Sequence, residues 1–137
     1  MIALTEDKRM LGYGVMTPYS NIFCFATTRR GGFSKGDYAS FNCTPYTGDD
    51  AESVRRNQEL LCNSMPQHPK ELVIPFQTHG TKVEVIDEKY LNATSDERTA
   101  MLQGVDALIT KEPDCCICIS TADCIPCLLY TSPSPRD

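Results

Sequence analysis

The chain has 137 residues, of which 41% are hydrophobic and 8% aromatic, and its formal net charge is −5. This length suits a single domain with a modest core. The negative charge argues against general binding to nucleic acid or to anionic membranes, because both rely on a basic surface. No apolar run approaches the roughly 20 residues that cross a bilayer, and the N-terminus lacks the apolar stretch of a signal peptide. We therefore expect a cytoplasmic protein, and the sequence leaves its oligomeric state open.

The first half of the chain predicts one strand, one long loop and one helix. Residues 21–27 are aromatic and β-prone, which is typical of a strand. Residues 31–50 are rich in glycine, serine, asparagine and aspartate, which predicts a long structured loop, and such loops are often functional. Asp49 and Asp50 can cap a helix over residues 51–62. The stripe of this helix that should face the core contains Ala51, Val54, Leu61 and Met65, with Gln58 as its one polar member.

Beyond Pro66 the sequence changes to short apolar runs that are typical of strands. We expect strands at residues 71–77, 81–86, 105–110, 115–120 and 125–130. Residues 92–103 are polar and have a weak helical tendency. About six strands against one clear helix predict an α/β (α+β) fold, with a mixed sheet and helices outside it.

The last seven residues, 131–137, differ abruptly from the apolar run before them. Pro133 and Pro135 exclude the continuation of a strand. We expect either a disordered tail or, the alternative we favour, a segment produced by a broken reading frame. The domain itself is expected to span residues 1–130.

Two short segments end an apolar run with a residue able to bind a transition metal, and these residues are His79 and Cys124. A catalytic zinc usually takes three protein ligands, so this pair is one ligand short. A single histidine is more often structural than a ligand, and Cys124 alone is equally ambiguous. Asp106 and Asp123, at the ends of predicted strands, can orient a ligating imidazole or simply form turns, which is the commoner role.

The eight cysteines suggest a second class of function. Without a signal peptide we expect reduced thiols, most of them serving as small core side chains. Cys124 and Cys127 have the CxxC spacing of a redox dithiol or of half a zinc knuckle, but a redox CxxC normally opens a helix, and here a strand is expected. A structural zinc would need a second pair, and Cys116 and Cys118 have the wrong spacing. A thiol or metal redox protein stays open as an alternative, as does an inactive fragment.

Two arginines mark a candidate anion site. Arg29 and Arg30 precede Gly31 and Gly32, where guanidinium and backbone N–H groups can hold a phosphate. As a motif on its own this is weak. The sequence signatures of nucleotide-binding folds and of serine hydrolases are absent.

Six segments, taken in order, resemble one family, and they are residues 25–34, 40–42, 47–50, 77–80, 105–110 and 121–126. The resemblance is to the laccase-domain-containing, YfiH-like purine nucleoside phosphorylases, formerly called multicopper polyphenol oxidases, and it runs from about residue 20 to Tyr130. It implies an α/β/β/α sandwich, here lacking its C-terminal part. It also implies zinc-dependent phosphorolysis of adenosine, inosine or methylthioadenosine, with inorganic phosphate as co-substrate, and deamination of adenosine. Older attributions gave the family copper and phenol oxidation.

Carried over to this sequence, the resemblance makes His79 and Cys124 ligands of zinc, or alternatively of copper. The family's third ligand is a histidine in a His-Ala-Gly-Trp-Arg-Gly motif, which nothing in this chain matches. We therefore expect an incomplete metal site and an open hydrophobic face. From their chemistry and motif positions, catalytic roles are expected for Arg29, Asn42 and Asp123, and phosphate or substrate binding for Arg29, Arg30 and Asn42.

Overall fold

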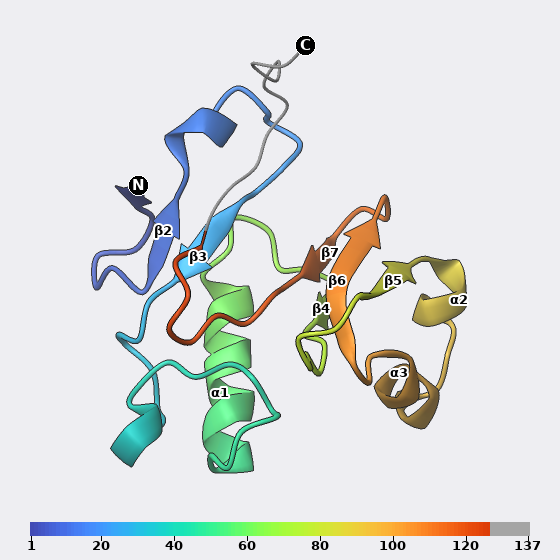
Figure 1. Ribbon diagram of the computed structural model, residues 1–137. Helices are drawn as coiled ribbons and strands as arrows, with labels where there is room; N and C mark the ends of the chain where they lie inside the picture. Colours follow the sequence, from blue (N-terminus) through green and yellow to red (C-terminus); the bar gives the residue numbers. More distant parts are fainter. Residues whose placement is uncertain (127–137) are drawn as a thin grey trace, which may run out of the picture.

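The computed structural model describes residues 1–126 as short strands and helices joined by long loops (Figure 1). The elements in chain order are β1 (Ile2–Ala3), β2 (Met10–Gly12), β3 (Phe25–Thr27), α1 (Ala51–Asn63), β4 (Glu71–Val73), β5 (Lys82–Ile86), α2 (Glu88–Leu91), α3 (Ser95–Met101), β6 (Val105–Thr110) and β7 (Cys115–Ile117). Two short 3-10 helices occupy Gly14–Met16 and Gly36–Tyr38. No helix within the described residues is long and apolar enough to cross a membrane.

The strands form three small sheets. β1, β2 and β3 are antiparallel, whereas β4 pairs with β7, and β5 with β6, in parallel. Parallel neighbours need a crossover connection, and α2 and α3 lie in the connection between β5 and β6 (Figure 1). The expected α/β fold is therefore confirmed, but within residues 1–126 parallel and antiparallel pairs lie in separate small sheets rather than in one mixed sheet.

Several expected strands are shorter than their apolar runs. The runs at 21–27, 71–77 and 115–120 form strands only at β3, β4 and β7. In the second run Pro75 has no N–H to donate to a ladder, so pairing stops before it. The runs at 81–86 and 105–110 form β5 and β6 as expected.

The sequence did not predict the two N-terminal strands, β1 and β2. β1 and β2 have two and three residues, too short for a periodicity to predict them. The strand expected at 125–130 does not include residues 125 and 126. Residues 127–130 of that strand, and the tail expected at 131–137, lie outside the described residues. The expected domain span of 1–130 stays a prediction.

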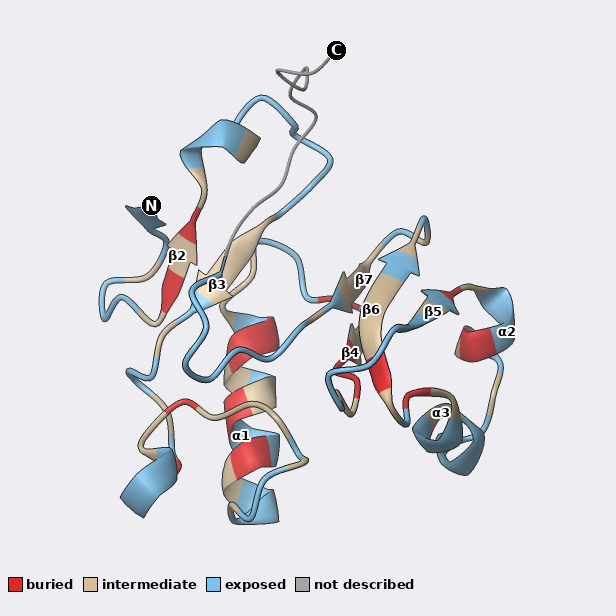
Figure 2. Cartoon of the chain, in the orientation of Figure 1, coloured by how far each residue is buried: buried red, intermediate tan, exposed pale blue. Residues whose placement is uncertain are grey.

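Helix α1 begins where expected, but its buried stripe differs. The side chain of Asp50 accepts the backbone N–H of Ser53 at 2.9 Å and caps the helix. Ala51 is exposed, so its predicted burial is wrong. The polar Asn57, which lies between Val54 and Leu61 on the same stripe, is fully buried. Figure 2 shows the buried positions of α1 in red. The stripe is therefore rotated toward Asn57, because the loop before the helix packs there.

The buried apolar side chains of residues 1–126 form two hydrophobic clusters. One contains Met10, Phe41 and Leu61 and joins β2, the 31–50 loop and α1. The other contains Val73, Ile86, Tyr90 and Leu102 and joins β4 and β5 to the region of α2 and α3. The first cluster anchors the 31–50 loop, which carries Asn42 and follows Arg29, and the second supports the turn between β4 and β5.

One face of the β5–β6 pair is open to solvent. Val83, Val85 and Ile109 are 50%, 51% and 57% exposed, and the register places Val85 beside Ile109. Parallel strands are usually covered on both faces. Within the described residues this face carries apolar side chains without such a cover.

Candidate functional site

The turn that carries His79 is held by one carboxylate. Asp106 lies near the start of β6, and its Oδ1 accepts the backbone N–H groups of Thr78 at 3.1 Å and His79 at 2.7 Å. Its Oδ2 accepts the N–H of Gly80 at 2.8 Å. His79 has a φ of 59°, a left-handed conformation that is uncommon for residues other than glycine. Asp106 thus shows the turn-forming role, because its partners are backbone groups.

These hydrogen bonds also favour the charged form of Asp106. The N–H of Gly80 contributes most, followed among the bonds by those of His79 and Thr78, and together they lower the pKa of the carboxyl below its ordinary value of 3.8. The carboxylate stays ionised near neutral pH and holds the exposed His79 on a defined turn. A turn fixed in this way reduces the entropy that the imidazole would lose on binding a ligand.

The segment of Cys124 is joined to the segment of His79 by a second contact. The Gln77 side chain accepts the backbone N–H of Ser120 at 2.7 Å and donates from Nε2 to the Ser120 carbonyl at 3.3 Å. Both backbone groups of Ser120 are therefore occupied by one amide. This paired contact brings together two motifs that are 43 residues apart in the chain.

Cys124 and Asp123 lie in an exposed segment that follows this contact. Among the described residues no set of three histidine, cysteine, aspartate or glutamate side chains could hold a metal ion. Three protein ligands are the usual contribution to a catalytic zinc. The assignment of His79 and Cys124 as metal ligands stays a prediction.

The 31–50 loop is organised around Asn57, a residue that the sequence analysis missed. Its Oδ1 accepts the backbone N–H of Phe33 at 2.8 Å. Its Nδ2 group lies 2.9 Å from Ser34 Oγ, 3.2 Å from the Ser40 carbonyl and 2.7 Å from the Asn42 carbonyl. One buried amide thus fixes four points of the loop. The signal in the sequence was an asparagine on the apolar stripe of α1.

Asn42, expected to contact substrate or to act in catalysis, is engaged inside the loop. Its Nδ2 donates to Thr47 Oγ1 and to Asp49 Oδ2, both at 3.0 Å, and its Oδ1 accepts the N–H of Thr44 at 3.2 Å. Asp49 also accepts the hydroxyl of Ser34 at 2.6 Å, and this bond is the main reason why the pKa of Asp49 is lowered. The polar atoms of Asn42 therefore have protein partners in this structure.

Arg29 and Arg30 are both exposed beside the glycine turn. Arg29 Nε donates to the Ala39 carbonyl at 2.9 Å, which fixes one edge of its guanidinium group. A Cβ added at Gly32 would lie 2.1 Å from the Ser40 carbonyl oxygen, so only glycine fits there. Two exposed cations thus lie beside a tight glycine turn, with Arg29 bound to Ala39, and their role as an anion site stays a prediction.

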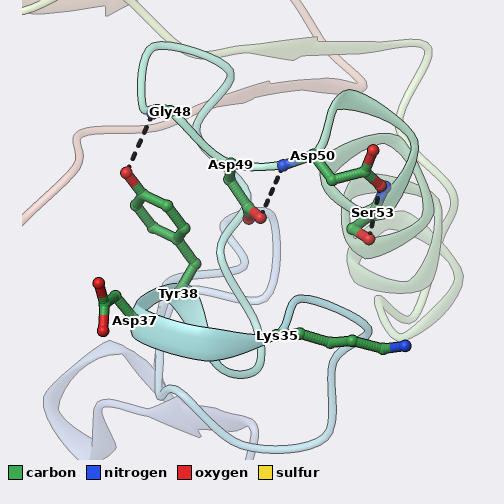
Figure 3. Close-up of a pocket in the computed structure, with 7 residues that line it drawn as sticks. All are labelled: Lys35, Asp37, Tyr38, Gly48, Asp49, Asp50 and Ser53. Carbon is green, nitrogen blue, oxygen red and sulfur yellow. Dashed lines mark hydrogen bonds between the residues drawn. The ribbon is translucent and has the colours of Figure 1, made fainter.

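A surface hollow of about 510 Å³ lies near the start of α1 (Figure 3). Its lining residues are Lys35, Asp37, Tyr38, Gly48, Asp49, Asp50 and Ser53. The Tyr38 hydroxyl accepts the N–H of Gly48 at 3.1 Å across it. Three carboxylates against one lysine do not suit an anion such as phosphate. None of the predicted catalytic or metal-binding residues lines this hollow.

Comparison with known proteins assigns the chain to a family. The family described as multi-copper polyphenol oxidoreductase laccase matches residues 23–135, and the chain belongs to this family. It is 63% identical over 130 residues to a purine nucleoside phosphorylase of Bacteroides thetaiotaomicron, covering 95% of this chain and 48% of that protein. It is 39% identical over 108 residues to adenosine deaminase RL5 from an unknown prokaryotic organism, covering 79% of this chain and 41% of that protein. The chain thus spans about half the length of the curated relatives it matches.

Solved structures agree with this assignment. The crystal structure of YlmD from Geobacillus stearothermophilus matches with a TM-score of 0.66 and 28% identity, covering 78% of this chain and 40% of that one. The Bacillus licheniformis hypothetical protein YfiH matches with a TM-score of 0.71 and 22% identity, covering 85% and 42%. The resemblance to YfiH-like proteins noted from the sequence is therefore confirmed, and so is the fold.

Proposed function

We propose that this chain forms part of an enzyme that cleaves purine nucleosides with inorganic phosphate, releasing a purine base and ribose 1-phosphate. The observation that carries the proposal is the 63% identity to a purine nucleoside phosphorylase across 95% of the chain. Adenosine, inosine and methylthioadenosine are the proposed substrates, and the last of these would give 5-methylthioribose 1-phosphate as its sugar product. The cytoplasmic location stays a prediction.

The geometry supports a site built around the His79 turn and the segment after Ser120. Asp106 fixes the backbone of the turn, and Gln77 joins it to Ser120. We assign His79 and Cys124 as two ligands of a zinc or copper ion whose remaining protein ligand lies outside residues 1–126. Such an ion supplies a Lewis acid with an open coordination position.

Phosphate binding is assigned to the arginine pair. The Nε of Arg29 donates to the Ala39 carbonyl, and the two terminal nitrogens of its guanidinium group remain for phosphate. Arg30 is exposed beside it. Guanidinium groups bind phosphate through paired N–H donors and stabilise negative charge as the glycosidic bond loosens. Asn42 is assigned a supporting role, because its amide holds the 31–50 loop that follows the arginines.

Deamination of adenosine is the second candidate reaction. It is favoured by the 39% identity to an adenosine deaminase. The two reactions are distinguished by phosphate, since phosphorolysis consumes it and deamination does not. Asp123, exposed beside Cys124, is the candidate for moving a proton in either reaction.

The test measures the products formed from adenosine and inosine with and without phosphate. It uses the chain itself and, in parallel, its residues 1–126 joined to the remaining residues of the Bacteroides thetaiotaomicron relative. We expect free base and ribose 1-phosphate to form only when phosphate is present. His79→Ala and Cys124→Ala should abolish this release and the bound metal together, whereas His68→Ala is the matched control and should change neither.

Arg30→Ala should raise the KM for phosphate more than the KM for nucleoside. Base release that needs no phosphate, or that survives in the His79→Ala and Cys124→Ala double variant, would contradict the proposal. Formation of inosine from adenosine without phosphate would instead support the second reaction.

A further inference from the structure

Two thiols at the end of β7 lie against each other. The Sγ atoms of Cys116 and Cys118 are 3.7 Å apart, and residues two apart on an extended strand place their side chains on the same side. All seven cysteines among the described residues are free thiols. Cys116 and Cys118 are the two of them that share a hydrogen bond between sulfurs.

The contact makes the two thiols chemically different. The two sulfurs share a hydrogen bond in which either thiol can be the donor. This hydrogen bond lowers the pKa of Cys116, although burial opposes it. The same contact, together with burial, raises the pKa of Cys118. Burial also raises the pKa of the thiols of Cys24, Cys43, Cys62 and Cys115. The thiolate, which is the form that reacts with oxidants, is therefore favoured at Cys116.

We propose that Cys116 and Cys118 form a redox pair that a peroxide converts reversibly into a disulfide. The Cys116 thiolate attacks one peroxide oxygen, the O–O bond breaks, and Cys116 becomes a sulfenic acid while the leaving hydroxide is protonated to water. The sulfur of Cys118 then attacks the Cys116 sulfur, and the sulfenic oxygen leaves as a second water with the Cys118 proton. Two thiols and one hydrogen peroxide thus give one disulfide and two waters.

The backbone around the pair suits a reversible reaction. The disulfide bond length requires the two sulfurs to approach by about 1.7 Å. Before Cys118 the chain pairs with β4 as strand β7, the Cys118 N–H donates to the Val73 carbonyl at 2.9 Å, and Ser120 is held by Gln77, so the backbone is fixed on both sides of Cys118. A disulfide between residues two apart closes a very small ring, and strained disulfides are the more easily reduced ones. This inference uses neither His79 nor Cys124 and does not depend on the proposed enzyme reaction.

The test oxidises the reduced full chain with one equivalent of hydrogen peroxide, alkylates the remaining thiols and maps the cysteines by mass spectrometry of peptides. We expect the loss of two of the eight thiols, and a mass 2 Da lower in the peptide that contains a linked Cys116 and Cys118. Treatment with a thiol reductant should restore both. Oxidation that leaves Cys116 and Cys118 open to alkylation would overturn the proposal.

Variants separate this pair from the other cysteines. Cys118→Ser should leave Cys116 as a sulfenic acid that dimedone captures, with no internal disulfide formed. Cys24→Ser, a half-buried thiol with a raised pKa, is the matched control and should keep the two-thiol loss. Cys124→Ser should also keep it. If the two-thiol loss disappears in Cys124→Ser, the reactive pair is a different one and the assignment is wrong.

Discussion

Asp106 Oδ1 accepts the backbone N–H of His79 at 2.7 Å, across 27 residues of sequence. The neighbouring N–H groups of Thr78 and Gly80 bind the same carboxylate. A side chain near the start of β6 thus determines the backbone of the turn that carries the candidate ligand. A substitution of Asp106 can therefore change the conformation of the turn while His79 itself is kept.

Asp106→Asn tests this relationship. The amide keeps one acceptor oxygen but replaces the other with an N–H₂ group, which cannot accept from Gly80. We expect hydrogen exchange at Thr78, His79 and Gly80 to become about tenfold faster or more. The measurement is amide exchange by NMR. Asp96→Asn, the same change at an exposed position of α3, is the control, and equal exchange in both variants would contradict the role given to Asp106.

The pH dependence of the turn follows from the lowered pKa of Asp106. In the unfolded chain an aspartate titrates near pH 3.9, so the carboxylate stabilises the turn above about that pH. This stabilisation is lost as the pH falls through the lower pKa of the folded state. The Gly80 amide shift should therefore titrate below about pH 3.9 and should not titrate in Asp106→Asn. A midpoint above that value would show that the hydrogen bonds do not stabilise the charged form.

Asn57→Ala should destabilise the fold through the 31–50 loop. The substitution removes a fully buried amide and leaves loop groups of Phe33, Ser40 and Asn42 without this partner. We expect the free energy of unfolding to fall by roughly 2–4 kcal/mol, measured by urea denaturation. Asn63→Ala makes the same chemical change at an exposed position of α1 and should cost less than about 0.5 kcal/mol. Similar losses in both variants would show that Asn57 does not organise the loop.

Gln77→Ala should separate the two motif segments. Both backbone groups of Ser120 lose the same partner, so the Ser120 amide should exchange faster and the reactivity of Cys124 toward alkylation should change. Gln67→Ala is the matched control, because the Gln67 amide also bonds across the chain, to Asp114 at 2.8 Å, but at a different place. An unchanged Ser120 amide in Gln77→Ala would mean that other contacts hold the segment.

Local sequence patterns predicted the elements whose signals are local. The alternation in residues 82–86 and the apolar run at 105–110 predicted β5 and β6, and Asp50 predicted the start of α1. Strands β1 and β2 were not predicted, because each forms from two or three residues whose pairing partners are elsewhere. The C-terminal ends of β4 and β7 were also not predicted, because both strands end before their apolar runs do.

The sequence likewise predicted only part of the candidate site. The sequence by itself determined which residue types can bind metal or phosphate, namely His79, Cys124, Arg29 and Arg30, because side-chain chemistry and motif order are written in it. Only the tertiary structure decided that Asp106 binds the backbone of the His79 turn rather than its imidazole, that Asn42 is engaged by its loop, and that Asn57 is buried. The outcomes for Asp106 and Asn57 depend on hydrogen bonds between residues 15 to 28 positions apart, whereas Asn42 binds residues of its own loop. Such partners are chosen when the chain packs, since a polar group excluded from water must find a partner wherever the fold places one.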